Sequence, residues 1–153
     1  MPQDFERLSK VNLAYLAGLI DGEGCIYLKR RAENSTWLQL MLTISQKDVA
    51  YLNKIKELIG KRCYFRKPGV TYTAANLVYS SNQAYEILKA IVPYLKLKRE
   101  QAEFAIDFYE NCKVPAGRKP RGIKLWQYMP ELWEEREMLF WAIKRLKDVR
   151  NVA

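Results

Sequence analysis

The stretch LAGLIDGEG, residues 16–24, decides how the rest of the chain is organised. It completes an apolar segment with the period of a helix, for which Ser9 and Asn12 are candidate N-terminal caps. The small residues of this helix are Ala14, Ala17, Gly18 and Gly22. Steps of three and four bring them close to one side, and such a strip lets two helix backbones approach closely. The stretch therefore predicts a helix that packs against another helix.

A pair of strands follows directly, because polarity alternates along the chain. In residues 25–31, Ile26 and Leu28 point to one face, and Tyr27, Lys29 and Arg31 to the other. After a polar break at residues 33–35, alternation resumes with an inner set of Leu38, Leu40, Leu42 and Ile44, and an outer set of Trp37, Gln39, Met41 and Thr43. The two segments predict a hairpin.

The remaining chain predicts a second hairpin among helices. Its strands are residues 62–67 and 71–80, about a turn at Pro68–Gly69. Helices are expected at residues 47–59 (ended by Gly60), 82–92, 98–112 and about 130–147, with a basic loop at 113–124. The order α-ββ-α-ββ-α-α-α predicts one α+β domain over residues 1–153, with a core of about 8–112 and a four-stranded antiparallel sheet covered by helices on one face. We interpret the C-terminal helix as a structural surface helix.

The outer face of the predicted sheet is polar, basic and aromatic. Its members are Tyr27, Lys29, Arg31, Trp37, Gln39, Met41, Thr43, Tyr64, Arg66, Tyr72 and Asn76. Such a face can lie in the major groove of DNA, where Gln, Arg and Lys side chains read base edges. The net charge of +9 favours a polyanionic partner. An exposed antiparallel face is ordinarily polar, however, so the face alone favours simple solvent exposure.

Composition excludes several classes of protein. The chain has no histidine, which excludes histidine-based acid–base catalysis, Ser-His-Asp triads and HEXXH zinc sites. Hydrolysis would have to use carboxylates, lysine and metal. The three cysteines are widely spaced, which favours reduced, buried thiols in an intracellular protein. The N-terminus is too charged for a signal peptide, and no apolar run approaches the roughly 20 residues of a membrane helix. We expect a soluble protein without a membrane partner, in a prokaryotic cytoplasm or an organelle.

The opening stretch resembles the LAGLIDADG signature of homing endonucleases. Seven of the nine positions are identical, with Gly22 for alanine and Glu23 for aspartate. Its position at the end of a helix and directly before a strand also matches, and the predicted order of elements over residues 8–112 resembles the family fold. Residues 45–47 and 95–98 are similar to segments that lie near the family's active site. Beyond Lys113 there is little resemblance.

The resemblance implies an intron-encoded, site-specific endonuclease that hydrolyses phosphodiester bonds of double-stranded DNA with magnesium. Glu23 would hold the metal together with the carbonyl of Gly22, with about two or three divalent ions in each dimer–DNA complex. Carboxylate, carbonyl and phosphate oxygens are ligands that magnesium prefers. Lys98 would supply positive charge near the scissile phosphate, and Gln46 would orient water. Asp21 would support the helix end.

A single motif in 153 residues implies a homodimer with a twofold axis through the motif helices, since double-motif relatives are about twice as long. The expected contact residues are Ala14, Ala17, Gly18 and Asp21. The target would be a long, nearly palindromic duplex, cut across its minor groove to leave 3′ overhangs. Two alternatives stay open: an RNA-binding intron maturase, which the basic loop would serve, and a DNA-binding regulator on the same fold that does not cleave.

Overall fold

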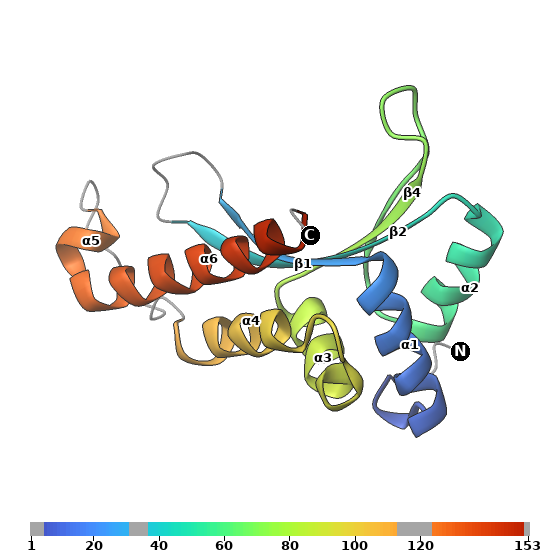
Figure 1. The fold of residues 1–153 in the computed structure, drawn as a ribbon, viewed down its shortest axis with the longest axis horizontal. Coiled ribbons are helices and arrows are strands. Elements are labelled where there is room, and N and C mark those ends of the chain that lie inside the picture. Colours follow the sequence, from blue (N-terminus) through green and yellow to red (C-terminus); the bar gives the residue numbers. More distant parts are fainter. Residues whose placement is uncertain (1–4, 31–36, 113–123, 152–153) are drawn as a thin grey trace.

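The computed structural model describes residues 5–30, 37–112 and 124–151 (Figure 1). The elements are η1 (Phe5–Arg7), α1 (Lys10–Glu23), β1 (Gly24–Arg30), β2 (Leu38–Gln46), α2 (Val49–Ile59), β3 (Tyr64–Arg66), β4 (Ala75–Ser80), α3 (Asn82–Ile91), η2 (Val92–Tyr94), α4 (Arg99–Asn111), α5 (Leu125–Tyr128) and α6 (Pro130–Asn151). The predicted α+β class and the order of the main elements are confirmed. The short helices η1, η2 and α5 were not predicted.

The four strands form one antiparallel sheet in the order β1-β2-β4-β3. The inner face carries fully buried residues from three strands, including Ile26, Leu42, Leu77 and Tyr79. Helices α1, α3 and α4 gather under this face (Figure 1). Leu77 and Tyr79 of β4 are buried on the inner face, which places Asn76 on the opposite face of the sheet. The second hairpin is shorter than predicted, because β3 and β4 cover fewer residues than the two polar-rich segments suggested.

Local signals in the sequence set the helix ends. The Ser9 hydroxyl accepts a hydrogen bond from the Asn12 amide at 3.2 Å and begins α1. Asp48 caps α2 in the same way, accepting from the Tyr51 amide at 2.9 Å. Gly60 ends α2 with a φ of 64°, a left-handed conformation that glycine adopts without a steric cost. These caps fix where each helix meets the sheet.

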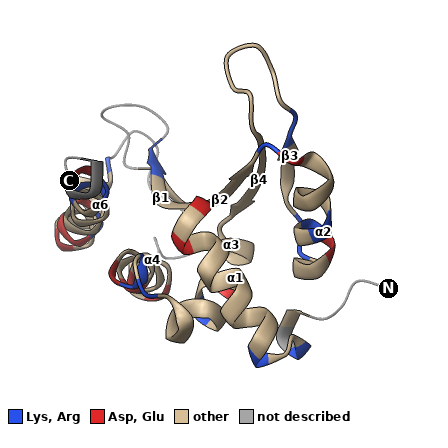
Figure 2. Ribbon diagram, turned by 45° about the vertical axis from the view of Figure 1, so that its right-hand side comes forward, with Lys and Arg blue, Asp and Glu red and all other residues tan. Residues whose placement is uncertain are grey.

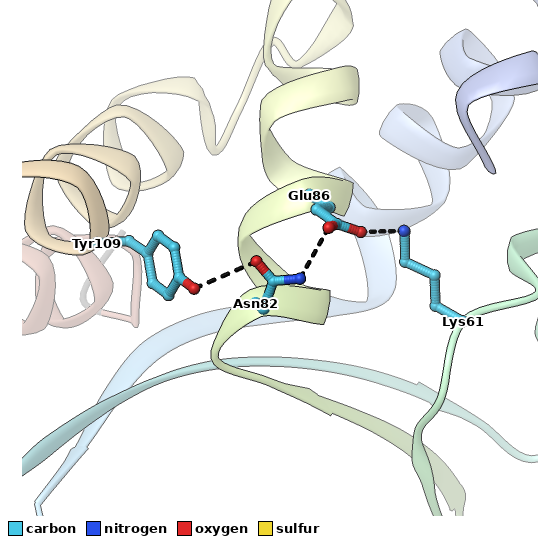
Figure 3. Close-up of polar contacts among 4 residues, drawn as sticks. All are labelled: Lys61, Asn82, Glu86 and Tyr109. Carbon is cyan, nitrogen blue, oxygen red and sulfur yellow. Dashed lines mark hydrogen bonds and ion pairs between the residues drawn. The ribbon is translucent and has the colours of Figure 1, made fainter.

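A polar network joins the helices to the sheet's far edge (Figure 3). Glu86 on α3 forms an ion pair with Lys61, which precedes β3, and accepts a hydrogen bond from Asn82 at 2.7 Å. The Tyr109 hydroxyl of α4 donates to the Asn82 side chain at 3.2 Å. The hydrogen bond from Lys61, and then that from Asn82, lowers the pKa of Glu86. The network therefore links α4, α3 and the segment that leads into β3.

Helix α6 lies beside β1, the edge strand of the sheet (Figure 1). Arg30 at the end of β1 forms an ion pair with Glu137 at 2.6 Å, and its guanidinium lies over the Phe140 ring, 4.3 Å from the centroid. Buried Arg136 donates to the carbonyl of Cys112 at 2.6 Å and ties α6 to the end of α4. Within the described ranges, no helix has the length and apolar character needed to cross a membrane.

Candidate active site and nucleic-acid interface

Helix α1 passes into β1 without a connecting loop, and Gly24 makes this possible. Its backbone amide donates to the Ile20 carbonyl. A Cβ atom at Gly24 would lie 2.7 Å from that carbonyl oxygen and 2.8 Å from the Ile20 Cα, which is closer than real side chains approach. Only glycine fits this turn. As a consequence, Glu23 is the last residue of α1 and directly precedes the first residue of the sheet.

Asp21 anchors a distant segment of the chain to the end of α1. Its two carboxylate oxygens accept hydrogen bonds from the backbone amides of Lys96 and Lys98, at 2.8 and 2.9 Å. Hydrogen bonds to an ionised carboxylate are stronger than those between neutral groups. Asp21 therefore holds the segment that precedes α4 against the motif helix. Its carboxylate is engaged within its own chain, although we expected it at the dimer contact.

The Lys98 side chain in turn caps the C-terminal end of α1. Its ammonium donates to three carbonyls, those of Ile20 at 2.9 Å, Asp21 at 2.8 Å and Gly24 at 2.6 Å. The last carbonyls of a helix have no partners within the helix and carry partial negative charge. A lysine at this position satisfies them and offsets the helix dipole beside Glu23. In this structure Lys98 acts on the site through the helix end.

Glu23 presents an exposed carboxylate. Among the described residues it has no hydrogen bond or ion pair, and Gly22 beside it is also exposed. Gln46 has turned toward its own backbone, where its side-chain oxygen accepts from the Lys47 amide at 3.0 Å. No group of three or more acidic or cysteine side chains suited to a metal occurs in the described part of the chain. One carboxylate and one carbonyl suit magnesium only when substrate oxygens complete the ligand set.

A hollow of about 290 Å³ lies between α1, β1 and the start of α4. Its lining residues are Asp21, Gly22, Gly24, Cys25, Ile26, Leu97, Lys98, Gln101 and Lys147. Lys147 comes from α6, near the other end of the chain, and nothing in the local sequence indicated that it would reach the motif. Residues of α1, of the segment that leads into α4 and of α6 therefore meet around this hollow.

One face of α1 is exposed along its whole length. Val11 is 77% exposed and Tyr15 49%, and Ala14, Gly18 and Gly22 continue the same strip. A Cβ atom at Gly18 or Gly22 would meet nothing within 4 Å, so the chain itself leaves this strip uncovered. The hydroxyls of Tyr15 and Tyr51 share a hydrogen bond, which raises the pKa of Tyr51 to about 12.

Ala17 does not belong to this strip. It is fully buried in the core of the chain, so it offers no exposed surface for the expected dimer contact. Ala17 and Gly18 are consecutive, and consecutive residues lie about 100° apart around a helix. The buried side of α1 therefore includes Ala17, and the exposed side includes Gly18.

On the outer face of the sheet, the strand register aligns residues of neighbouring strands in rows that run across the strands. One row pairs Lys29 with Gln39, and the next aligns Tyr27, Met41 and Ser80. A third row crosses the whole sheet through Cys25, Thr43, Val78 and Tyr64, and a fourth through Ser45, Asn76 and Arg66. The predicted outward residues of the strands therefore share one face. Figure 2 shows basic residues at the far end of β1 and near β3, and acidic residues at the end of α1.

Several outer-face residues are engaged by neighbours. The Asn76 side chain lies between Ser45 and Arg66; in the amide orientation that satisfies both, its oxygen accepts from Arg66 Nη2 at 2.9 Å. The Arg66 guanidinium also lies over the Tyr72 ring, 4.6 Å from its centroid. Gln39 donates to the Ser81 hydroxyl at 2.9 Å. Such contacts orient these side chains on the sheet before any ligand binds.

The exposure of this face is uneven. Met41 and Asn76 are only 7% and 4% exposed, so neither is an open contact residue in the free chain. Tyr64 and Tyr72 are well exposed, and Tyr72 belongs to the loop before β4. The Thr43 hydroxyl is buried without a hydrogen-bond partner among the described residues. Beside these rows, a hollow of about 660 Å³ is lined by Lys29, Gln39 and Arg62, among others.

One predicted contact lies elsewhere. Trp37 precedes β2 and lines a hollow shared with Phe108 and Tyr109 of α4, at the side of the sheet. Arg31 lies outside the described residues, as does the basic loop except for Lys124. The three cysteines are free thiols; Cys112 is buried as expected, whereas Cys25 and Cys63 are only partly buried.

These features define an α+β protein with an exposed carboxylate at the end of a helix that has one uncovered face, and with a polar, basic sheet face beside it. The sequence profile of the LAGLIDADG endonucleases matches residues 16–115, and the chain belongs to this family of DNA endonucleases. No curated protein sequence matches the chain.

Solved structures share the fold. The homing endonuclease I-CvuI, in complex with the I-CreI target in the presence of magnesium and with the DNA not cleaved, has a TM-score of 0.69 and 22% identity over 90% of this chain and 82% of that one. The archaeal intron-encoded homing endonuclease I-Vdi141I, in complex with DNA, has a TM-score of 0.63 and 15% identity over 89% and 84%. The meganuclease I-SmaMI, bound to uncleavable DNA, has a TM-score of 0.62 and 14% identity, and 86% of this chain covers 44% of that one.

Proposed function

We propose that this chain is a site-specific, magnesium-dependent homing endonuclease that cuts double-stranded DNA as a homodimer. The observation that carries the proposal is the position of Glu23. Its exposed carboxylate stands at the end of the exposed strip of α1 and next to the outer face of the sheet. Two copies paired through this strip would bring two Glu23 carboxylates together beneath one DNA duplex.

The exposed strip suits a twofold contact. An isologous interface uses the same patch on both subunits, and small residues allow two helix backbones to approach closely. Gly18 and Gly22 provide open space, while Val11 and Tyr15 supply exposed apolar surface on the same strip. The half-length overlap with I-SmaMI also supports a pair of copies, because one copy of this chain corresponds in length to about half of that protein.

The oxygen atoms at the end of α1 suit a magnesium ion as ligands. Glu23 and the Gly22 carbonyl would hold magnesium together with phosphate oxygens of the DNA. Two separate complexes of I-CvuI with DNA were solved, one in the presence of magnesium and one in the presence of calcium. When bound, the ion supplies an activated water and stabilises the leaving oxygen. Lys98 holds the end of α1 in place and offsets its dipole, so that Glu23 keeps its position when a second negative group approaches. Gln46 would orient water after release from the Lys47 amide.

DNA recognition would use the outer face of the sheet. Lys29 and Gln39 are paired across β1 and β2, and both line the hollow of this face. Lysine and glutamine side chains can donate to base edges in the major groove. The basic surplus of the chain provides the less specific attraction to phosphates. Neither alternative, the RNA maturase or the regulator, is favoured by a contact among the described residues.

Lys29→Ala should weaken DNA binding at the flanks of the target. Lys29 is exposed and lies six residues beyond Glu23, about 20 Å along the strand at a rise of about 3.3 Å per residue, so its loss should leave the cleavage site intact. We expect affinity to fall about tenfold. Binding of a target duplex at moderate salt measures this, with Lys54→Ala on the exposed side of α2 as the control. Unchanged affinity for Lys29→Ala would exclude this part of the sheet from the interface.

The activity itself is tested by incubating the protein and magnesium with a duplex that spans the insertion site of its own gene. Defined ends at one position support the endonuclease proposal, and an uncut duplex argues against it.

A further inference from the structure

Helix α6 brings a lysine to the hollow beside the motif helix. Lys147 lines this hollow together with Gly22, Lys98 and Gln101. It is also half-buried, with its ammonium 5.3 Å from the centroid of the Tyr27 ring on the outer face of β1. Lys147 therefore stands between the candidate metal ligand and the sheet face that would carry DNA. It lies beyond residues 16–115, the part that the family profile matches.

The position of Lys147 is fixed by the docking of α6 along β1. Leu139 and Ile143 are buried in the core, and the Arg30–Glu137 ion pair holds the helix at the far end of the strand. Buried Arg136 anchors the same helix to the Cys112 carbonyl. A helix held at several points along its length presents a later residue at a defined place, so the approach of Lys147 to the motif is a consequence of packing.

The two lysines of the hollow differ in the hydrogen-bond donors that they retain. An ammonium has three N–H donors, and Lys98 directs three hydrogen bonds to carbonyls of α1 and β1. Lys147 has the ring of Tyr27 as a neighbour and no hydrogen bond or ion pair among the described residues. The acidic neighbour in the hollow, Asp21, already accepts from two backbone amides. Lys147 thus keeps donors for an incoming anion.

We propose that Lys147 is a phosphate-binding residue of the active site, and that its ammonium binds the DNA backbone beside the phosphodiester group served by Glu23. This inference rests on the proposed endonuclease function. A duplex on the outer face that reaches Glu23 must pass Tyr27 and Cys25, and Lys147 contacts the first of these and shares the hollow with the second. Lysine binds phosphate as a compact point charge without demanding geometry.

The test compares Lys147→Ala with Lys144→Ala. Lys144 is the matched control, because it lies one turn earlier on α6, has the same charge and also sits over an aromatic ring, at 4.9 Å from the Trp141 centroid, but does not line the hollow. Binding of a mixed-sequence duplex is measured against salt concentration. Loss of one phosphate contact per subunit should reduce the slope of log affinity against log salt by about 2 per dimer for Lys147→Ala, with no change for Lys144→Ala.

Cleavage gives the second readout. In single-turnover assays on the target duplex, we expect Lys147→Ala to cut about 10- to 100-fold more slowly and Lys147→Arg to recover most of the rate, since arginine keeps the charge. Thermal unfolding checks that each variant is folded. A salt slope and rate for Lys147→Ala equal to those of Lys144→Ala would overturn the inference, as would equal losses in Lys147→Ala and Lys147→Arg. Cleavage by the unaltered protein that depends on Glu23 would leave the proposed function standing in either case.

Discussion

Glu23→Gln should abolish DNA cleavage while DNA binding survives. Glutamine has nearly the same shape but no negative charge, so it is a poor ligand for a hard divalent cation. Glu23 is exposed and has no partner among the described residues, so the substitution should not disturb the fold. We expect the single-turnover cleavage rate to fall by about a thousandfold or more, with affinity measured in calcium changed by less than about threefold.

Glu57→Gln provides the control for charge, because Glu57 is an exposed glutamate on α2. It should cut at the rate of the unaltered protein. Glu23 is one methylene longer than the aspartate of the family signature, so Glu23→Asp is informative as well: retained or faster cleavage would indicate that the carboxylate, and not its reach, is the requirement. Normal cutting by Glu23→Gln in magnesium would show that the site has been assigned to the wrong residue.

Gly18→Leu should convert the protein from a dimer to a folded monomer. A Cβ atom at Gly18 meets nothing within 4 Å in the subunit, and leucine favours a helix over glycine by somewhat less than about 1 kcal/mol. The subunit should therefore keep its thermal stability. Between two paired helices, however, the larger side chain would prevent close approach of the backbones. Mass measurement in solution should give a dimer for the unaltered protein and a monomer for the variant.

Cleavage of both strands should be lost together with the dimer, since one subunit supplies one Glu23. Glu134→Leu places the same side chain at an exposed position on α6 and should remain dimeric. If the Gly18→Leu variant remained dimeric, the twofold contact would have to lie away from α1. A monomer of the unaltered protein, with and without DNA, would remove the argument for pairing altogether.

The main elements could be predicted from the sequence because local signals agree with the tertiary structure. Ser9 and Gly60 mark helix ends by side-chain or backbone chemistry that acts within a few residues. The alternation in β1 and β2 follows from the period of a strand with one buried face. These signals need no knowledge of distant contacts.

The site depended on contacts between distant residues, which local patterns do not contain. The sequence placed Lys98 near the active site only by resemblance, and nothing in it indicated that the ammonium would cap α1. Met41 alternates as an outward residue, yet its neighbours bury it. Lys147 reached the hollow because α6 docks along β1, a result of the Arg30 contacts and the buried residues of the helix. Sequence patterns gave this helix only a structural role.

The central claim, cleavage of duplex DNA by a Glu23-dependent homodimer, is tested most directly by mapping the ends that the protein produces. A duplex that spans the insertion site of its own gene is incubated with the protein and magnesium, and both strands are sequenced to their termini. We predict one cut in each strand, offset across the minor groove to leave 3′ overhangs, with no product when magnesium is chelated or when Glu23 is replaced by glutamine. Specific binding of the same duplex in magnesium, with both strands left intact, would contradict this and favour a regulator that does not cleave.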